Sequence, residues 1–153
     1  MMPKIKQLSP EDTALLQACA VLDRLCLPEE AWSFESFLSE TRKPGGIVLA
    51  AVHENQEVCG FLTAFQVMDT ADLTNIAVAP AFRRQGIAGA LLKKLCSVVG
   101  NAEIFLEVRE SNQPAIAFYQ KYGFVPVGIR KHFYQNPDEN AVLMQIQSGG
   151  LLC

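Results

Sequence analysis

Residues 73–92 read LTNIAVAPAFRRQGIAGALL and predict a strand, a basic glycine turn and a helix in direct succession. The first six residues form a strand-like apolar run, which Pro80 ends. Residues 86–99 repeat apolar side chains at helical spacing. Backbone N–H groups at a helix start, with Arg83 and Arg84 beside them, suit phosphate oxygens. The stretch therefore indicates an α/β fold that holds an anion at this turn.

The surrounding charge favours the same interpretation. Between Asp72 and Glu103 there is no acidic residue, and the cations of this stretch are Arg83, Arg84, Lys93 and Lys94. A solvated helix face could explain the two lysines, but not the acid-free gap around the turn, because local charge steers anionic ligands. The turn is not a P-loop, since no Gly-Lys-Ser/Thr follows, and it lacks the three spaced glycines of a dinucleotide site.

Periodicity elsewhere predicts one mixed α/β domain. Strands are expected at residues 4–8, 47–53, 58–65, 72–78, 104–108, from 124 onward and at 141–146. Helices are expected at 9–26, 33–41, 86–99 and 114–122. We expect Ser9 to cap the first helix, with Pro10 at its first position, and Ser33 to cap the second. Early strands followed by a strand–helix–strand–helix–strand order imply a mixed sheet.

Length and composition set the limits of this domain. A chain of 153 residues, 50% of them hydrophobic, fits a single domain, which we place at residues 1–147, with residues 148–153 as a flexible tail. No apolar run approaches ~18 residues, so we expect no membrane association, and the first residues lack the apolar stretch of a signal peptide. The net charge of −3 argues against a general nucleic-acid binder.

The cysteines indicate a reduced, cytoplasmic protein. There are 5, scattered along the chain, and all but the C-terminal one fall in apolar or periodic segments. Cys19, Cys26, His53 and Cys59 lack the paired short spacing of a zinc site, so we expect no metal. Cys59 and Cys96 lie in apolar runs, where thiols are usually inert nucleophiles.

Two residues beyond the turn are candidates for acid–base chemistry. Glu107 lies on a predicted strand whose neighbours Leu106 and Val108 point to the opposite side, toward the core. An exposed ion pair with Arg109 would explain Glu107 equally well, and this alternative stays open. Tyr119 lies on the following helix, where packing in the core is an ordinary alternative to a chemical role.

Several segments together resemble one known family, the GCN5-related N-acetyltransferases. They are Asn75–Pro80, Arg83–Ala88, Leu106–Arg109, Asn112 and Ala117–Phe124. Within that family the chain is most similar to the RimI-type enzymes, which acetylate the N-terminal alanine of a ribosomal protein. The resemblance implies a single α/β domain with a twisted, mostly antiparallel sheet, splayed in the middle and flanked by about four helices.

The resemblance also implies acetyl-CoA as the cofactor and assigns residues to it. Cofactor binding would fall to Ile76, Ala77, Val78, Arg84, Gln85, Gly86, Ile87, Ala88, Gly89 and Asn112. Glu107 would receive the amine proton and Tyr119 would protonate the departing thiolate, in direct attack within a ternary complex. The assignment is chemically sensible, because a free α-amine with a pKa near 8 is already about one-tenth neutral at pH 7.

On the acceptor side, the resemblance assigns substrate binding to Trp32, Arg130 and Tyr134. The expected acceptor is the N-terminal α-amine of a ribosomal protein, with no direct contact to nucleic acid, and the enzyme is either a monomer or a weak dimer. The chain departs from the family's usual residues at three places. It has Ala31-Trp32 where Pro-Trp is frequent, Ala88-Gly89 where Gly-Arg is common, and Glu139-Asn140 where Glu-Asp is frequent. Two alternatives stay open: acetylation of a small amine such as a polyamine or aminoglycoside, and non-catalytic binding of acyl-CoA.

Overall fold

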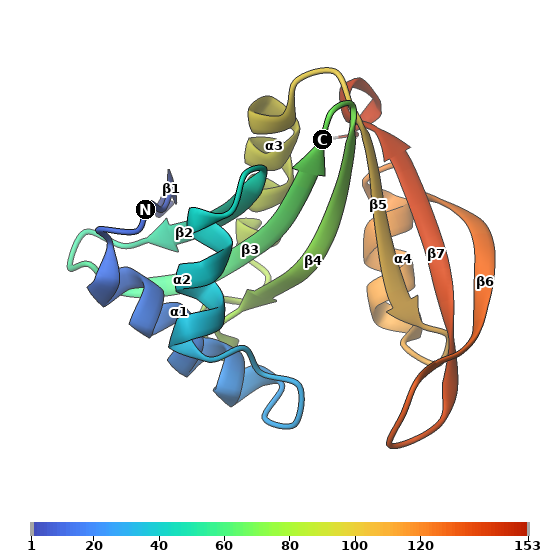
Figure 1. The fold of residues 1–153 in the computed structure, drawn as a ribbon, viewed down its shortest axis with the longest axis horizontal. Helices are drawn as coiled ribbons and strands as arrows, with labels where there is room; N and C mark the ends of the chain where they lie inside the picture. Colours follow the sequence, from blue (N-terminus) through green and yellow to red (C-terminus); the bar gives the residue numbers. More distant parts are fainter. Residues whose placement is uncertain (1, 153) are drawn as a thin grey trace.

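The computed structural model describes residues 2–152, which form one seven-stranded sheet and four α-helices (Figure 1). The strands are β1 (Lys4–Gln7), β2 (Gly46–Val52), β3 (Val58–Val67), β4 (Thr70–Val78), β5 (Glu103–Arg109), β6 (Val125–Tyr134) and β7 (Glu139–Gln147). The helices are α1 (Thr13–Cys26), α2 (Phe34–Arg42), α3 (Ile87–Val99) and α4 (Gln113–Lys121), with 3₁₀ turns η1 (Pro80–Phe82) and η2 (Ser148–Gly150). The strand order is β1-β2-β3-β4-β5-β7-β6, and only β4 and β5 run parallel. The predicted fold class is confirmed.

Two apolar layers cover the first half of the sheet. Because side chains alternate along a strand, Val48 and Ala50 of β2 pack under α1 and α2, whereas Ile47 and Leu49 pack under α3. Helix α4 continues the α3 layer beneath β5 and β7 (Figure 1). On its opposite side β5 carries only exposed or half-buried residues. That side is therefore free to form one wall of a site.

The first two helix starts differ in how far the sequence predicted them. Ser33 caps α2 as expected, its hydroxyl accepting a hydrogen bond from the Ser36 N–H at 3.1 Å. The cap at Ser9 is wrong, because α1 begins only at Thr13 after Asp12. The Asp12 carboxylate accepts the Ser9 N–H at 2.8 Å and the Lys6 ammonium at 2.9 Å, which folds residues 9–12 into a turn.

The sheet opens between β4 and β5. Only three residue pairs connect these strands, Thr70–Asp72 with Glu103–Phe105. Just beyond them the register of β3 and β4 shifts, so that Thr74 is an extra residue, and its hydroxyl lies 2.8 Å from that of Thr63. Such a bulge bends and twists its strand, which turns β4 away from β5. The remaining part of β4 thus has a strand neighbour on one side only.

The end of the chain packs against the body of the protein as far as it is described. Ser148 is buried and its hydroxyl donates to the Gly100 carbonyl at 2.6 Å, while the Leu152 N–H donates to the Tyr122 carbonyl at 2.9 Å. The segment expected to be a flexible tail, residues 148–153, is therefore hydrogen-bonded to the body of the protein at Ser148 and at Leu152. Cys153 lies outside the described residues. No helix between residues 2 and 152 is both long and apolar enough to cross a membrane.

Candidate active site

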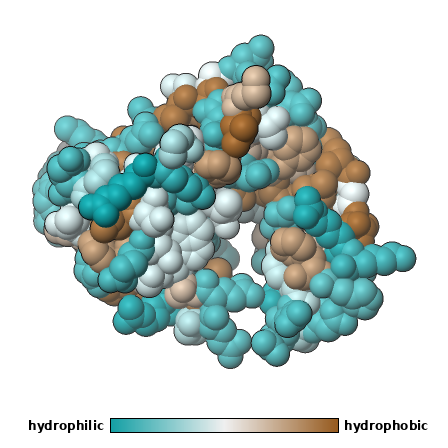
Figure 2. Space-filling model, in the orientation of Figure 1, coloured by the Kyte–Doolittle hydropathy of each residue, from teal (hydrophilic) through white to brown (hydrophobic). Residues whose placement is uncertain are grey.

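A pocket of about 500 Å³ lies where β4 and β5 part. Figure 2 shows the molecule hollowed between its two halves at this place, with hydrophilic rims. Residues 73–78 of β4 and 106–109 of β5 form its facing walls. The rest of the lining comes from the α1–α2 loop, from α4 with its cap Asn112, and from Ala88 of α3 and Tyr134 of β6. Because the strands are separated, the pocket is lined by side chains from both sides of the sheet. The sequence segments of the predicted site thus meet in one cavity.

The glycine turn adds an anion-binding end to this cavity. Arg84 and Gly86 both have positive φ, +65° and +81°, so the backbone curls before α3 begins. No backbone N–H from Arg84 to Gly89 donates to an acceptor within residues 2–152, and the space where Gly86 would carry a Cβ is empty. Consecutive free N–H groups at a helix start form a concave donor site for phosphate oxygens. The turn therefore fits a diphosphate.

Not every residue of the turn faces the pocket. Ala88 lines it, whereas Ile87 is buried in the core beneath β3. A Cβ at Gly89 would overlap the Tyr122 hydroxyl, so any side chain there would displace the Tyr122 ring. The Arg83 guanidinium turns back to β4, donating to the Val78 carbonyl at 3.1 Å. The turn's contribution to ligand binding is accordingly made mainly by backbone.

Tyr119 is positioned by an aromatic cluster at the back of the pocket. Its ring is 7% exposed and meets Phe118 and Phe124 edge to face, at centroid distances of 5.3 and 5.5 Å. Burial, and to a smaller extent Tyr134, raises the pKa of Tyr119 above its ordinary value. The phenol therefore keeps its proton at neutral pH, which is the form required of a proton donor. Core packing and a chemical role are compatible for this residue.

Glu107 enters the pocket from the other side of the sheet. It is half-buried, between the core residues Leu106 and Val108, as the alternation predicted. Its carboxylate lies 3.5 Å from the Arg130 guanidinium, and burial together with this carboxylate raises the pKa of Tyr134 to about 12. Glu107 and Tyr134 thus border the same part of the cavity. Arg130, expected to bind substrate, lies beside Glu107 and does not line the pocket.

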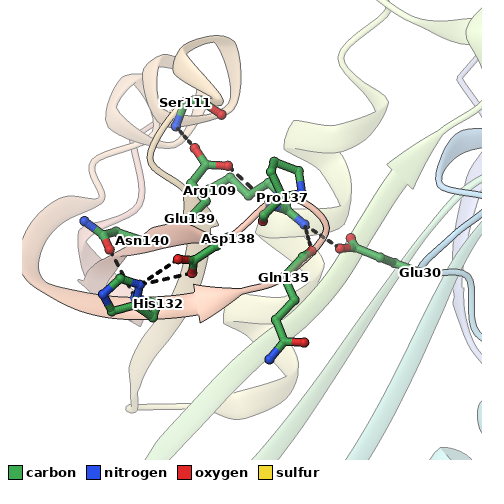
Figure 3. A network of polar contacts seen from close by, with 9 residues as sticks. All are labelled: Glu30, Arg109, Ser111, His132, Gln135, Pro137, Asp138, Glu139 and Asn140. Atoms are coloured by element: carbon green, nitrogen blue, oxygen red, sulfur yellow. Dashed lines mark hydrogen bonds and ion pairs between the residues drawn. The ribbon is translucent and has the colours of Figure 1, made fainter.

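Arg109 does not pair with Glu107, so the alternative of a Glu107–Arg109 ion pair is wrong. Its guanidinium binds Glu30 of the α1–α2 loop at 2.9 Å and Glu139 of β7 at 3.3 Å (Figure 3). It also donates to the Gln135 and Pro137 carbonyls at 3.2 Å, and it lies 4.4 Å from the centre of the Tyr134 ring. Arg109 therefore joins the two rims of the pocket, the α1–α2 loop and the β6–β7 hairpin.

Two further predicted residues have structural contacts as well as a place in the lining. Asn112 caps α4 by accepting the Ala115 N–H at 3.3 Å, and the residue also lines the pocket. Trp32 lies at the end of the α1–α2 loop, and its ring packs on Phe37 at a centroid distance of 5.3 Å. Both positions are compatible with the roles expected from the family resemblance.

Sequence reasoning missed three residues that shape this site. Glu30 and Asn75 line the pocket, and Asp23 lies fully buried behind it. The only sequence signal for Asp23 was a carboxylate next to the apolar face of the first helix, four residues after the buried Cys19. Glu30 carried no such signal, because its partner Arg109 is 79 residues away in the chain.

Known proteins similar to this chain point to one family. Residues 13–124 match the Acetyltransferase (GNAT) family. A Bacillus subtilis protein, named provisionally as a [ribosomal protein bS18]-alanine N-acetyltransferase, is 33% identical over 118 residues, 75% of this chain and 78% of that protein. The [ribosomal protein bS18]-alanine N-acetyltransferase of Escherichia coli is 40% identical over 98 residues, 61% of this chain and 66% of that enzyme.

The solved structures agree with these relatives. The crystal structure of the ribosomal-protein-S18-alanine N-acetyltransferase from Escherichia coli superposes with a TM-score of 0.79 at 30% identity, covering 95% of this chain and 94% of that one. The match extends over both halves of the splayed sheet, including the β6–β7 hairpin, which the family segment 13–124 leaves out. The resemblance read from the motifs is confirmed, and the chain belongs to the acetyltransferase (GNAT) family.

Proposed function

We propose that this protein transfers the acetyl group of acetyl-CoA to the N-terminal α-amine of a protein, namely the N-terminal alanine of a ribosomal protein. The observation that supports this most directly is that one pocket is bordered by a carboxylate, Glu107, and a protonated phenol, Tyr119, beside an anion-binding turn. The relatives named as ribosomal-protein-alanine N-acetyltransferases support the choice of acceptor.

The residues present fit acetyl-CoA. Free N–H groups between Arg84 and Gly89 would bind the diphosphate, with the cations of the turn adding charge. The open edge of β4 at Ile76–Val78 would bind the amide groups of the pantetheine arm, and Asn112 would contact the same arm through its amide group. When bound, the cofactor supplies an activated acetyl carbonyl in the gap between β4 and β5.

The chain's own residues would carry the protons of the reaction. Glu107, directly or through water, accepts a proton from the attacking amine, whose nitrogen forms the new bond to the acetyl carbon. Tyr119 donates its proton to the sulfur as the carbon–sulfur bond breaks. Backbone N–H groups at the bulged segment of β4 would stabilise the negative charge on the carbonyl oxygen. The proton lost by the amine is balanced by the one gained by the sulfur.

The acceptor would approach between the two rims. Trp32 on the α1–α2 loop and Tyr134 on β6 face this opening, and Arg130 would act there through its ion pair with Glu107. An N-terminal amine needs less assistance than a lysine side chain, because a lysine with a pKa near 10.4 is neutral in fewer than about one molecule in a thousand at pH 7. A single half-buried carboxylate is therefore an adequate base for this acceptor.

The test compares acceptors on one enzyme preparation. We expect acetylation of a peptide with the N-terminal sequence of a ribosomal protein that begins with alanine, detected as the mass of an acetyl group on its α-amine. Polyamines, aminoglycosides and the same peptide with a blocked N-terminus serve as competitors and control. Preferred transfer to a small amine would refute the proposed acceptor while leaving the acetyl-CoA assignment intact.

Catalytic roles are tested separately. Glu107→Gln and Tyr119→Phe should each lower kcat about a hundredfold or more while the Kd for CoA, measured by calorimetry, stays near the wild-type value. The phenylalanine keeps the contacts to Phe118 and Phe124, so the loss reports on the hydroxyl. Unchanged kcat in both variants would indicate a protein that binds acyl-CoA without using these residues in catalysis.

A further inference from the structure

Asp23 is the most completely buried carboxylate next to the pocket. It lies in the last full turn of α1 and is 0% exposed. One of its oxygens, Oδ2, accepts two hydrogen bonds, from the Trp32 backbone N–H at 2.9 Å and from the Asn75 side-chain amide at 2.9 Å. The other, Oδ1, is buried and has no hydrogen-bond partner among residues 2–152. A buried carboxylate with an oxygen left over costs stability, so its presence needs a reason.

The two partners of Asp23 belong to two different elements that line the pocket. Trp32 ends the α1–α2 loop, which forms the acceptor rim, and Asn75 follows the bulge of β4, next to the residues proposed to bind the pantetheine arm. Asp23 also binds the start of the loop, because its backbone carbonyl accepts the Leu27 N–H at 2.7 Å. The bond to Leu27 is the last backbone hydrogen bond of α1, which any residue at position 23 would make, so the Asp23 side chain fixes the loop at Trp32 and, through Asn75, joins it to the sheet.

We propose that Asp23 is a positioning residue that fixes the acceptor rim at Trp32 against β4 through the two hydrogen bonds at its Oδ2 atom. On the outside the rim is held by the Glu30–Arg109 ion pair, whose Glu30 side chain is 49% exposed. Exposed pairs hold geometry weakly, so the inner attachment sets the distance between the rim and the strand edge. For its kinetic part this inference rests on the proposed function.

Geometry and charge can be separated at this position. Asparagine places a carbonyl oxygen where Oδ2 lies, so Asp23→Asn can keep both hydrogen bonds while it removes the charge and puts its amide nitrogen at the Oδ1 position. Asp23→Ala removes both bonds, and Asn75→Ala removes only the bond to the sheet. A positioning role through hydrogen bonds therefore predicts the largest effect in Asp23→Ala and a smaller one in Asn75→Ala. Asp23→Asn should stay close to wild type.

The chain offers a matched control in Glu40. This residue is also a buried carboxylate, 5% exposed, with one oxygen paired to Lys43 at 2.8 Å and the other, Oε2, without a partner in the described chain. It lies on α2 and does not line the pocket. Glu40→Ala therefore reproduces the loss of a buried carboxylate without disturbing the rim. A lower melting temperature in this variant measures the purely structural effect.

The first readout does not depend on activity. Trp32 is the only tryptophan of the protein, so acrylamide quenching of its fluorescence reports on the rim alone. We expect quenching to rise in Asp23→Ala and less in Asn75→Ala, and to stay at the wild-type level in Asp23→Asn and Glu40→Ala. Equal quenching in Asp23→Ala and wild type would overturn the proposal, whatever the acceptor proves to be.

The second readout is the KM for the alanine-start peptide. Loss of hydrogen bonds to a charged group should raise it about tenfold in Asp23→Ala, with the Kd for CoA within about twofold of wild type. A purely structural role would lower the fraction of active protein and leave KM unchanged. A similar rise in Asp23→Asn would overturn the proposal, because the charge and not the bonds would then matter. If Asp23→Ala does not fold, the Asn75→Ala variant provides the test. Wild-type values of both KM and fluorescence quenching in that variant would overturn the proposal.

Discussion

Replacing Arg109 by methionine should lower the free energy of unfolding by about 2.5 kcal/mol. The guanidinium is 22% exposed and donates to the carbonyls of Gln135 and Pro137, each such bond contributing about 1 kcal/mol. Its contact with the Tyr134 ring adds about 0.5 kcal/mol. The ion pairs are given no weight in this sum, since partly solvated pairs contribute least. Methionine keeps an apolar stem of similar length, so packing changes little.

The loss can be measured as a fall in melting temperature of about 5–10 °C for a domain of this size, and as a lower urea midpoint with an unchanged slope. Arg130→Met is the matched control, because its side chain is 55% exposed and has one ion pair, with Glu107 at 3.5 Å, and one distant contact with the Phe133 ring, 5.7 Å from its centre. We expect that control to stay within about 0.5 kcal/mol of wild type. If the Arg109→Met and Arg130→Met variants had the same melting temperature, the contacts of Arg109 with the hairpin would not stabilise the fold, and the reasoning would be refuted.

Three further predictions concern backbone, pH and thiol chemistry. Gly45→Ala should lower the free energy of unfolding by about 3 kcal/mol, because Gly45 has φ +84° and a Cβ there would overlap the Gln66 carbonyl. Gly86→Ala should lower it by only about 1 kcal/mol in a urea titration, because Gly86 has φ +81° but faces open space. The same variant should bind CoA more weakly. Hydrogen bonds from Ser111, and then Arg109, hold the pKa of Glu139 below its ordinary 4.5, so this stabilisation is present above pH 4.5 and lost as the pH falls. Urea midpoints at pH 6 and pH 3 should therefore differ less in Glu139→Gln than in wild type. Burial raises the pKa of Cys19 to about 12, so mass spectrometry should find this thiol unalkylated by iodoacetamide at pH 8 until urea unfolds the protein.

Much of the fold could be predicted because the determining signals are local. The period of two in residues 103–109 predicted the correct faces of β5, and the apolar repeat after Gly86 predicted α3 within one residue of its start. The cap at Ser9 failed because the Asp12 carboxylate competes for the same backbone groups and delays the helix. Local rules thus hold until a neighbouring side chain offers the backbone a second partner.

The sequence predicted more of the cofactor side of the site than of the acceptor side. The proposed cofactor side consists of backbone features: a glycine at positive φ, free N–H groups at a helix start and a strand edge left open by a bulge. Short, contiguous sequence motifs determine these features. The acceptor side depends on contacts between side chains far apart in the sequence, such as Glu30 with Arg109 and Asp23 with Asn75. No spacing rule predicts such pairs.

The same difference between backbone and side-chain contacts bears on how members of one fold can select different acceptors. The strand edge and the helix start must keep their backbone geometry to hold one cofactor, so few residue changes are compatible with them. The α1–α2 loop and the β6–β7 hairpin are attached by a small number of polar contacts, among them those of Arg109 and Asp23. A substitution at one contact can move a rim without disturbing the core, because the α1–α2 loop contributes no residue to the main layer around α3, and the β6–β7 hairpin contributes to it only through Val142, Met144 and Ile146 of β7. We therefore expect acceptor specificity in this protein to depend on the attachments of the rims, and those are the positions at which an exchange of acceptor should be sought.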